Sequence, residues 1–158
     1  MSLRAASSAA VAVVLLGAPA PARAASWANP ELLVTPDAVH ANAGKPDWVV
    51  VDCRDLKEYA KGHIPGAISF GKECKKALRD PTSRIFKDPK RYEAFLGKAG
   101  IGNDTHVVFY GEHKVTDTFK DATVAFWLLE YLGHTKAHVL NGGLDPFIHA
   151  YLIQHAGR

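Results

Sequence analysis

The 158-residue sequence contains only two cysteines, Cys53 and Cys74, and they are not arranged as C-x-x-C. That arrangement is typical of zinc sites and thioredoxin-type redox sites, so we expect neither. The eight histidines are scattered along the chain without acidic or cysteine neighbours, so we predict no metal site and no cofactor. Whether the two cysteines form a disulfide stays open, because the sequence does not give the distance between their Cα atoms.

A large excess of one charge is also missing, with 19 Lys and Arg against 16 Asp and Glu. The single basic cluster comprises Lys72, Lys75, Lys76 and Arg79, and no aromatic residues alternate with them. A nucleic-acid-binding surface usually has a longer basic stripe with interleaved aromatics. We therefore interpret the cluster as a solvated loop face and predict no nucleic-acid partner.

The amino-terminal residues have the three parts of a secretory signal peptide. Arg4 supplies a positive charge, residues 5–16 form an apolar core, and residues 17–24 end in a small-x-small cleavage pattern. The core is too short to cross a bilayer, and the alternatives are an uncleaved anchor or a disordered tail. We predict a signal peptide at 1–24 cleaved after Ala24 or Ala25, a linker at 25–30 and one domain at 31–158. The mature protein is then periplasmic or secreted, without membrane contact.

Strand-like and helix-like segments alternate through the predicted domain. The predicted strands are 31–34, 48–52, 67–70, 106–110 and 137–140, and the main predicted helices start near Thr35 and cover 55–60, 88–99, 120–132 and 145–155. Residues 71–87 are predicted as a loop with at most a short helix. The 48–52 segment is continuously apolar, which is typical of a central parallel strand buried on both faces. The pattern predicts an α/β fold of three layers, with a five-stranded, mostly parallel sheet flanked by helices.

The most specific motif begins where the 48–52 strand ends. It reads Asp52-x-Arg54, then Glu58-Tyr59, then Gly-His-Ile-Pro-Gly-Ala over residues 62–67. This pattern resembles the first signature of the rhodanese (sulfurtransferase) superfamily and implies a rhodanese-like fold. We predict structural roles for its residues. Asp52 accepts backbone N–H bonds, and Arg54 pairs with a carboxylate such as Glu58. His63 bridges two loops, and Pro65-Gly66 forms a turn.

In the family that this motif indicates, a cysteine at the start of a strand-to-helix loop carries the chemistry. Backbone N–H groups of that loop hold an anion and lower the pKa of the thiol, which accepts sulfur as a persulfide. Gly111 stands at the matching position, and residues 111–121 contain no cysteine. Residues 122–134 and 139–144 are similar to the N-terminal, non-catalytic half of tandem-domain thiosulfate or mercaptopyruvate sulfurtransferases. The resemblance thus implies a module that supports a catalytic domain, and leaves the chain's own activity uncertain.

Two other functions remain open from the residues. One is a sulfurtransferase that works through Cys53 or Cys74; Cys53 follows a strand on the side where open α/β sheets place ligands, although a cysteine there is more often a small buried hydrophobe. The other is a module that binds or senses a small sulfur oxyanion through Gly111, His113 and Lys114. Glu58 and Asp52 are not expected to act as an acid–base pair, because the motif gives each a structural partner.

The segment Ala122–Leu132 is apolar almost all round, whereas a helix that covers one sheet face needs only one apolar stripe. Either the helix is deeply buried, or it contacts a second rhodanese domain or a partner chain. The chain ends at Gly157-Arg158, where a tandem enzyme would enter its interdomain linker, so we hypothesise an incomplete or split reading frame. The oligomeric state stays open.

Overall fold

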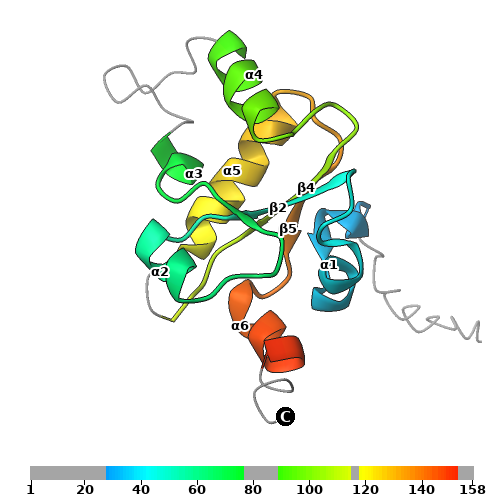
Figure 1. Cartoon of the computed structure of the whole chain (residues 1–158). Coiled ribbons are helices and arrows are strands. Elements are labelled where there is room, and N and C mark those ends of the chain that lie inside the picture. The colour runs from blue at the N-terminus through cyan, green and yellow to red at the C-terminus, as the bar shows by residue number, and fades with distance from the viewer. Residues whose placement is uncertain (1–27, 77–88, 115–117, 153–158) are drawn as a thin grey trace, which may run out of the picture.

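The computed structural model of the chain describes residues 28–76, 89–114 and 118–152, drawn in colour in Figure 1. Its sheet has five strands in the order β1-β5-β4-β2-β3, and every pairing is parallel. The strands are β1 (Leu33–Val34), β2 (Trp48–Asp52), β3 (Ile68–Ser69), β4 (His106–Tyr110) and β5 (Ala137–Leu140). Helices flank the sheet, so the predicted α/β fold with a five-stranded sheet is confirmed.

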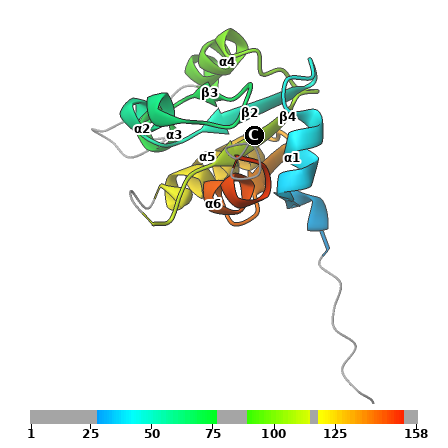
Figure 2. The ribbon, with the colours of Figure 1, turned by 60° about the horizontal axis from the view of Figure 1, so that its bottom comes forward.

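Two groups of helices cover the sheet, as Figures 1 and 2 show. On one face α1 packs together with α6, and on the other face α3, α4 and α5 pack together. The helical segments are η1 (Pro30–Leu32), α1 (Pro36–Asn42), α2 (Leu56–Lys61), α3 (Glu73–Lys76), α4 (Pro89–Lys98), α5 (Phe119–Tyr131), α6 (Leu144–Phe147) and a π-helical turn, η2 (Ile148–Leu152).

The two central strands contribute to both faces, which explains their continuous apolar sequence. Val50 and Val108 face the core that contains Phe147, whereas Val51 and Phe109 face the core under α5. β2 and β4 pair from Trp48 opposite His106 to Asp52 opposite Tyr110. Because both strands end at the same edge, the residues that follow them are brought together there.

Several predicted elements differ at their ends. The first strand is restricted to Leu33–Val34, because Pro30–Leu32 form a 3-10 turn in place of an extended segment. The predicted strand 67–70 pairs only at Ile68–Ser69. The last helix begins at Leu144 and widens into the π-helical turn that ends at Leu152, and the remainder of its predicted range lies outside the described residues. The predicted signal peptide, most of the linker and Asp88 also lie outside them.

α5 is not deeply buried on all sides, which was one of the two alternatives. Ala122, Ala125 and Leu129 are buried against the sheet, whereas Trp127 and Tyr131 are 52% and 61% exposed. The two exposed rings stack with their centroids 5.5 Å apart. The helix therefore covers the core with one face and presents aromatic surface on another. Among the described helices, none is long and apolar enough to span a membrane.

Candidate functional site at the carboxyl ends of the central strands

A buried ionic network occupies the ends of β2 and β4. The Asp52 carboxylate accepts hydrogen bonds from the Arg54 backbone N–H at 2.8 Å and from Nη2 of its guanidinium at 2.6 Å. The hydroxyl of Tyr110 donates to the same carboxylate at 2.5 Å. Asp52 and Tyr110 are fully buried and Arg54 is 4% exposed. Burial and the Asp52 charge raise the pKa of Tyr110. Burial lowers the pKa of Arg54, but Asp52 and Tyr110 together raise it above its usual value.

The same network fixes the Gly-His-Ile-Pro-Gly-Ala loop of residues 62–67. Nη2 of Arg54 donates to the carbonyl of Gly62 at 2.7 Å, and the backbone N–H of Ile64 donates to the Tyr110 hydroxyl at 3.2 Å. The hydroxyl of Tyr59 donates to the carbonyl of Ala67 at 2.7 Å, across the loop. These bonds join the loop to β4, to α2 and to the turn after β2. The motif therefore works as structural support at this edge of the sheet.

Two predicted contacts of the motif are wrong. Arg54 does not pair with Glu58, because its side chain turns back onto Asp52; Glu58 pairs with Lys61 at 2.7 Å, and that hydrogen bond lowers the pKa of Glu58. His63 does not bridge two loops in the described residues, because its Nδ1 lies 3.0 Å from the carbonyl of Tyr59 and its ring stacks on the Tyr59 ring. The Pro65-Gly66 turn is present, and φ of Gly66 is +80°.

Gly111 directly follows β4, and the backbone of the next helix fills the space above its Cα. A Cβ atom built on Gly111 would lie 2.4 Å from the carbonyl oxygen of Thr118 and 2.7 Å from the backbone nitrogen of Phe119. Real Cβ atoms do not approach backbone atoms this closely, and a backbone neighbour cannot rotate away. The position that matches the family's cysteine is thus closed to any residue with a side chain.

Internal hydrogen bonds hold this closed loop in place. The N–H of Glu112 donates to Oγ1 of Thr118 at 3.1 Å, and the N–H of Phe119 donates to the carbonyl of Glu112 at 3.2 Å. The carbonyl of Gly111 accepts from the N–H of Leu144 at 2.9 Å. Two backbone donors at the mouth of the loop therefore bond within the chain and do not point into an open anion site.

The buried carboxylates around the loop lie next to cations. Glu112 and Asp121 are each 8% exposed. A carboxylate oxygen of Glu112 lies 4.0 Å from Nη1 of Arg54, and Lys75 lies 3.7 Å from Asp121. Each of these two cations is therefore already paired with a carboxylate of the chain.

The predicted oxyanion residues are not gathered into one site by the described part of the loop. Gly111 is buried, whereas the Lys114 side chain is 74% exposed and lies 3.9 Å from the carboxylate of Asp145. The ring of His113 packs on Phe119, with centroids 4.2 Å apart. Residues 115–117, which complete the loop, lie outside the described residues. Oxyanion binding by these residues stays a prediction.

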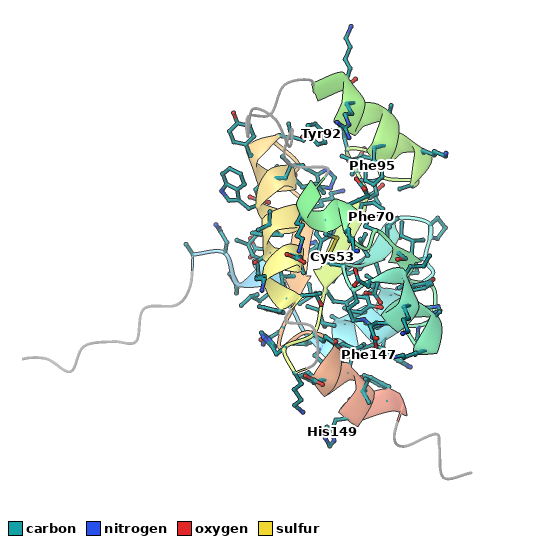
Figure 3. All side chains as sticks on the ribbon, turned by 90° about the vertical axis from the view of Figure 1, so that its left-hand side faces the viewer. Cys53, Phe70, Tyr92, Phe95, Phe147 and His149 are labelled. Atoms are coloured by element: carbon teal, nitrogen blue, oxygen red, sulfur yellow. A yellow bond between two sulfur atoms is a disulfide. The ribbon has the colours of Figure 1, made fainter. Side chains whose placement is uncertain are left out.

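The two cysteines form a disulfide, with their Cα atoms 5.5 Å apart. Cys53 follows β2 and Cys74 lies in α3, and Figure 3 shows Cys53 in the middle of the molecule. They are 2% and 1% exposed. In this form neither sulfur is a thiol, so neither can act as a nucleophile. Within the described ranges, no group of three or more His, Cys, Asp or Glu could hold a metal ion.

Sequence reasoning missed two residues of this edge, Tyr110 and Thr118. The role of Tyr110 follows from the β2–β4 register, which places it opposite Asp52. Thr118 contributes because its backbone lies over Gly111 and its Oγ1 accepts from the N–H of Glu112. The length of the 111–118 segment was the only signal for it in the sequence, because a long loop has enough chain to fold back on its own start.

Comparison with known proteins agrees with the motif and the fold. A model of the rhodanese-like domain family matches residues 35–150. Similar proteins include the "Putative thiosulfate sulfurtransferase SseA" of Mycobacterium tuberculosis, 34% identical over 124 residues that are 78% of this chain and 40% of that protein. Another is the "Thiosulfate sulfurtransferase" of Corynebacterium glutamicum, 33% identical over 77% of this chain and 39% of that protein. The chain thus spans about two fifths of the length of these relatives.

Solved structures give the same result. The 3-mercaptopyruvate sulfotransferase SseA of Escherichia coli is similar with a TM-score of 0.60 and 26% identity, over 75% of this chain and 48% of that one. YnjE is similar with a TM-score of 0.60 and 25% identity, over 76% of this chain and 29% of that one. The family model covers most of the chain, and the predicted motif and sheet are both present. The chain belongs to the rhodanese-like domain family.

Proposed function

We propose that this chain is an exported, non-catalytic rhodanese-like module that supports a catalytic sulfurtransferase domain. The observation that carries the proposal is the closed space at Gly111. Sulfur relay in this family needs a thiolate in an amide-lined pocket. Here the backbone of Thr118 and Phe119 occupies the place of the side chain, and the N–H groups of Glu112 and Phe119 bond within the loop.

The disulfide supports both parts of the proposal. Disulfides persist in oxidising compartments and are rare in the cytosol, so the Cys53–Cys74 bond agrees with a signal peptide at residues 1–24. The same bond removes the two thiols that an alternative enzyme would need. A sulfurtransferase that works through Cys53 or Cys74 would first have to reduce a buried bond.

We place the partner surface on the exposed side of α5. Trp127 and Tyr131 stack on one face of α5 and are 52% and 61% exposed, and Leu132, which follows the helix, is 37% exposed. Tyr and Trp are the residues that most often dominate protein–protein binding energy. The relatives are about two and a half times as long as the matched segment, so a further domain has room beside the region matched here. The occupant in this proposal is a catalytic rhodanese domain, in another chain or in a longer protein.

The activity test uses the purified chain with thiosulfate and cyanide, and it measures thiocyanate. We expect no turnover with the disulfide intact and none after reduction with dithiothreitol. Cys53→Ser and Cys74→Ser distinguish the alternatives: turnover that is lost in one of them would show that a cysteine of this chain carries sulfur. Calorimetry with thiosulfate tests the oxyanion alternative, which predicts binding that Lys114→Ala abolishes.

The export and partner proposals have separate tests. Fractionation of a bacterial host that expresses the full chain should recover it outside the cytoplasm, with a new amino terminus at Ala25 or Ser26. Sequencing the gene region beyond codon 158 should reveal a second rhodanese domain that contains the loop cysteine. That domain should bind the chain, and Trp127→Ser should weaken binding at least about 30-fold, as for a central aromatic contact. Lys57→Ser on α2 is the matched control and should leave the affinity unchanged.

A further inference from the structure

The short helix α3 is a single turn that packs against α5. At its start the N–H of Glu73 donates to the carbonyl of Phe70 at 2.9 Å, that of Cys74 to Gly71 at 3.2 Å and that of Lys75 to Lys72 at 3.3 Å. An isolated turn of this length is not stable in water. Among the α3 side chains whose exposure is described, only Cys74 is buried, while Glu73 and Lys75 face solvent. The one α3 side chain described as buried is thus also the one bonded covalently to the rest of the fold.

Cys53, at the other end of the bridge, belongs to a rigid part of the fold. Its backbone N–H continues the β2–β4 ladder by donating to the carbonyl of Tyr110 at 2.9 Å. Its side chain lies in the core with Phe109 and Ala122, beneath α5. The disulfide thus joins the short helix α3 to the end of the central strand β2.

An ion pair also joins α3 to α5. Nζ of Lys75 lies 3.7 Å from the Asp121 carboxylate in the first turn of α5, and the Lys75 side chain is 48% exposed. A half-exposed ion pair of this kind contributes little to stability. The disulfide is accordingly the stronger of the two links.

We propose that the Cys53–Cys74 disulfide is a redox-controlled latch, which holds α3 against the first turns of α5 and releases residues 71–76 when it is reduced. The reductant is a small-molecule dithiol. It supplies two electrons and two protons, the S–S bond breaks into two cysteine thiols, and the dithiol leaves as its own disulfide. Because both sulfurs are buried, exchange proceeds from a transiently opened form.

The release is local, because the sheet and the larger helices do not depend on α3. β2 and β4 stay paired along all five residues, and α5 remains attached through Ala125, Leu128 and Leu129. In a reducing compartment the chain then has a loose segment beside the Gly111 loop, and in an oxidising one the segment is fixed. The inference does not use the supporting role proposed above, and its test involves no sulfur transfer.

The test is amide hydrogen exchange of the full chain, followed by mass spectrometry of the 70–76 peptide. We compare the oxidised chain, the chain reduced with dithiothreitol and the double variant Cys53→Ala/Cys74→Ala. The disulfide closes a loop of 21 residues between Cys53 and Cys74 and so restricts the opened form strongly. Without the bond, hydrogen exchange of the Glu73, Cys74 and Lys75 amides should therefore rise at least about tenfold. A peptide from β4, residues 106–110, is the internal control and should change less than about twofold.

Lys75→Met is the matched control, because it removes the ion pair and keeps the disulfide. Its 70–76 peptide should exchange within about fivefold of the wild-type rate. The latch is refuted by equal exchange in the oxidised and reduced chains. It is also refuted if the β4 peptide accelerates as much as 70–76, or if the reduced chain loses its circular dichroism, because the bond then stabilises the whole domain. Equal acceleration by Lys75→Met would assign the tether to the ion pair instead.

Discussion

Replacing Gly111 with cysteine is the most direct test of the closed loop. The substitution supplies the residue that the family uses, at the position that matches its catalytic cysteine. The new Cβ would lie 2.4 Å from the carbonyl oxygen of Thr118 and 2.5 Å from its carbonyl carbon. Both are backbone atoms, so no side-chain rotation relieves the contact. We therefore expect Gly111→Cys to destabilise the fold without creating a sulfurtransferase.

The cost can be worked out from what must move. Inserting an atom into a packed site costs about 1–3 kcal/mol. Displacing the Thr118–Phe119 backbone also weakens the bonds from Glu112 N–H to Thr118 Oγ1 and from Phe119 N–H to Glu112 carbonyl, each worth about 1 kcal/mol. The sum is about 3 kcal/mol or more. For a domain of this size that lowers the melting temperature by about 10 °C.

Urea unfolding and thermal circular dichroism measure the effect, and the thiosulfate–cyanide assay measures activity. Gly111→Ala separates the steric cost from thiol chemistry and should be destabilised equally. Gly97→Ala is the matched control: Gly97 lies in α4 with no atom within 4 Å of a new Cβ, so alanine should stabilise the helix by about 0.5–1 kcal/mol. Wild-type stability of Gly111→Ala, or thiocyanate produced by a folded Gly111→Cys chain, would refute the reasoning.

Two further substitutions test the buried network and the histidines near β1. Arg54→Met leaves the Asp52 carboxylate buried without its cationic partner and should lower the free energy of unfolding in urea by about 3–5 kcal/mol. Lys61→Met breaks only the Glu58 pair and should lower it by less than about 0.5 kcal/mol. Equal losses would contradict the assigned pairing. Burial, then His138 and Lys136, lower the pKa of His106, so the unfolded chain takes up this proton first and stability should fall as pH drops below about 6.5. His106→Asn, which can keep a donor toward His138, should reduce that pH dependence, and an unchanged slope between pH 7.5 and 5.5 would exclude His106 as its source.

The central strands could be predicted to the residue because they are buried on both faces. Trp48–Asp52, His106–Tyr110 and Ala137–Leu140 are the observed bounds of β2, β4 and β5, as expected from their apolar runs. A helix was also predicted to start near Thr35, and the Oγ1 of Thr35 caps α1 by accepting from the N–H of Ala38 at 3.2 Å. These features depend on neighbours in the sequence. Such local patterns can be recognised in a single chain.

The errors concern contacts that depend on the folded path of the chain. Arg54 had a carboxylate on either side in the sequence, and the tight turn after β2 places its guanidinium on Asp52 rather than on Glu58. The disulfide required α3 to fold back over the end of β2, which spacing alone does not show. The filled space at Gly111 likewise requires the backbone of Thr118 and Phe119 to lie over Gly111. The spacing of residues in the sequence predicts where helices and strands lie, but not which side chains contact one another at their ends.

The edge of the sheet where the family performs its chemistry is held together here by bonds within the chain. Arg54 and Tyr110 neutralise and hydrogen-bond Asp52, Thr118 covers Gly111, and the sulfur of Cys53 is bonded to Cys74. In a catalytic site, donors and a nucleophile must stay available for a substrate. When the same groups bond to one another, they contribute to folding stability instead. Substitutions at this edge should therefore change the free energy of unfolding.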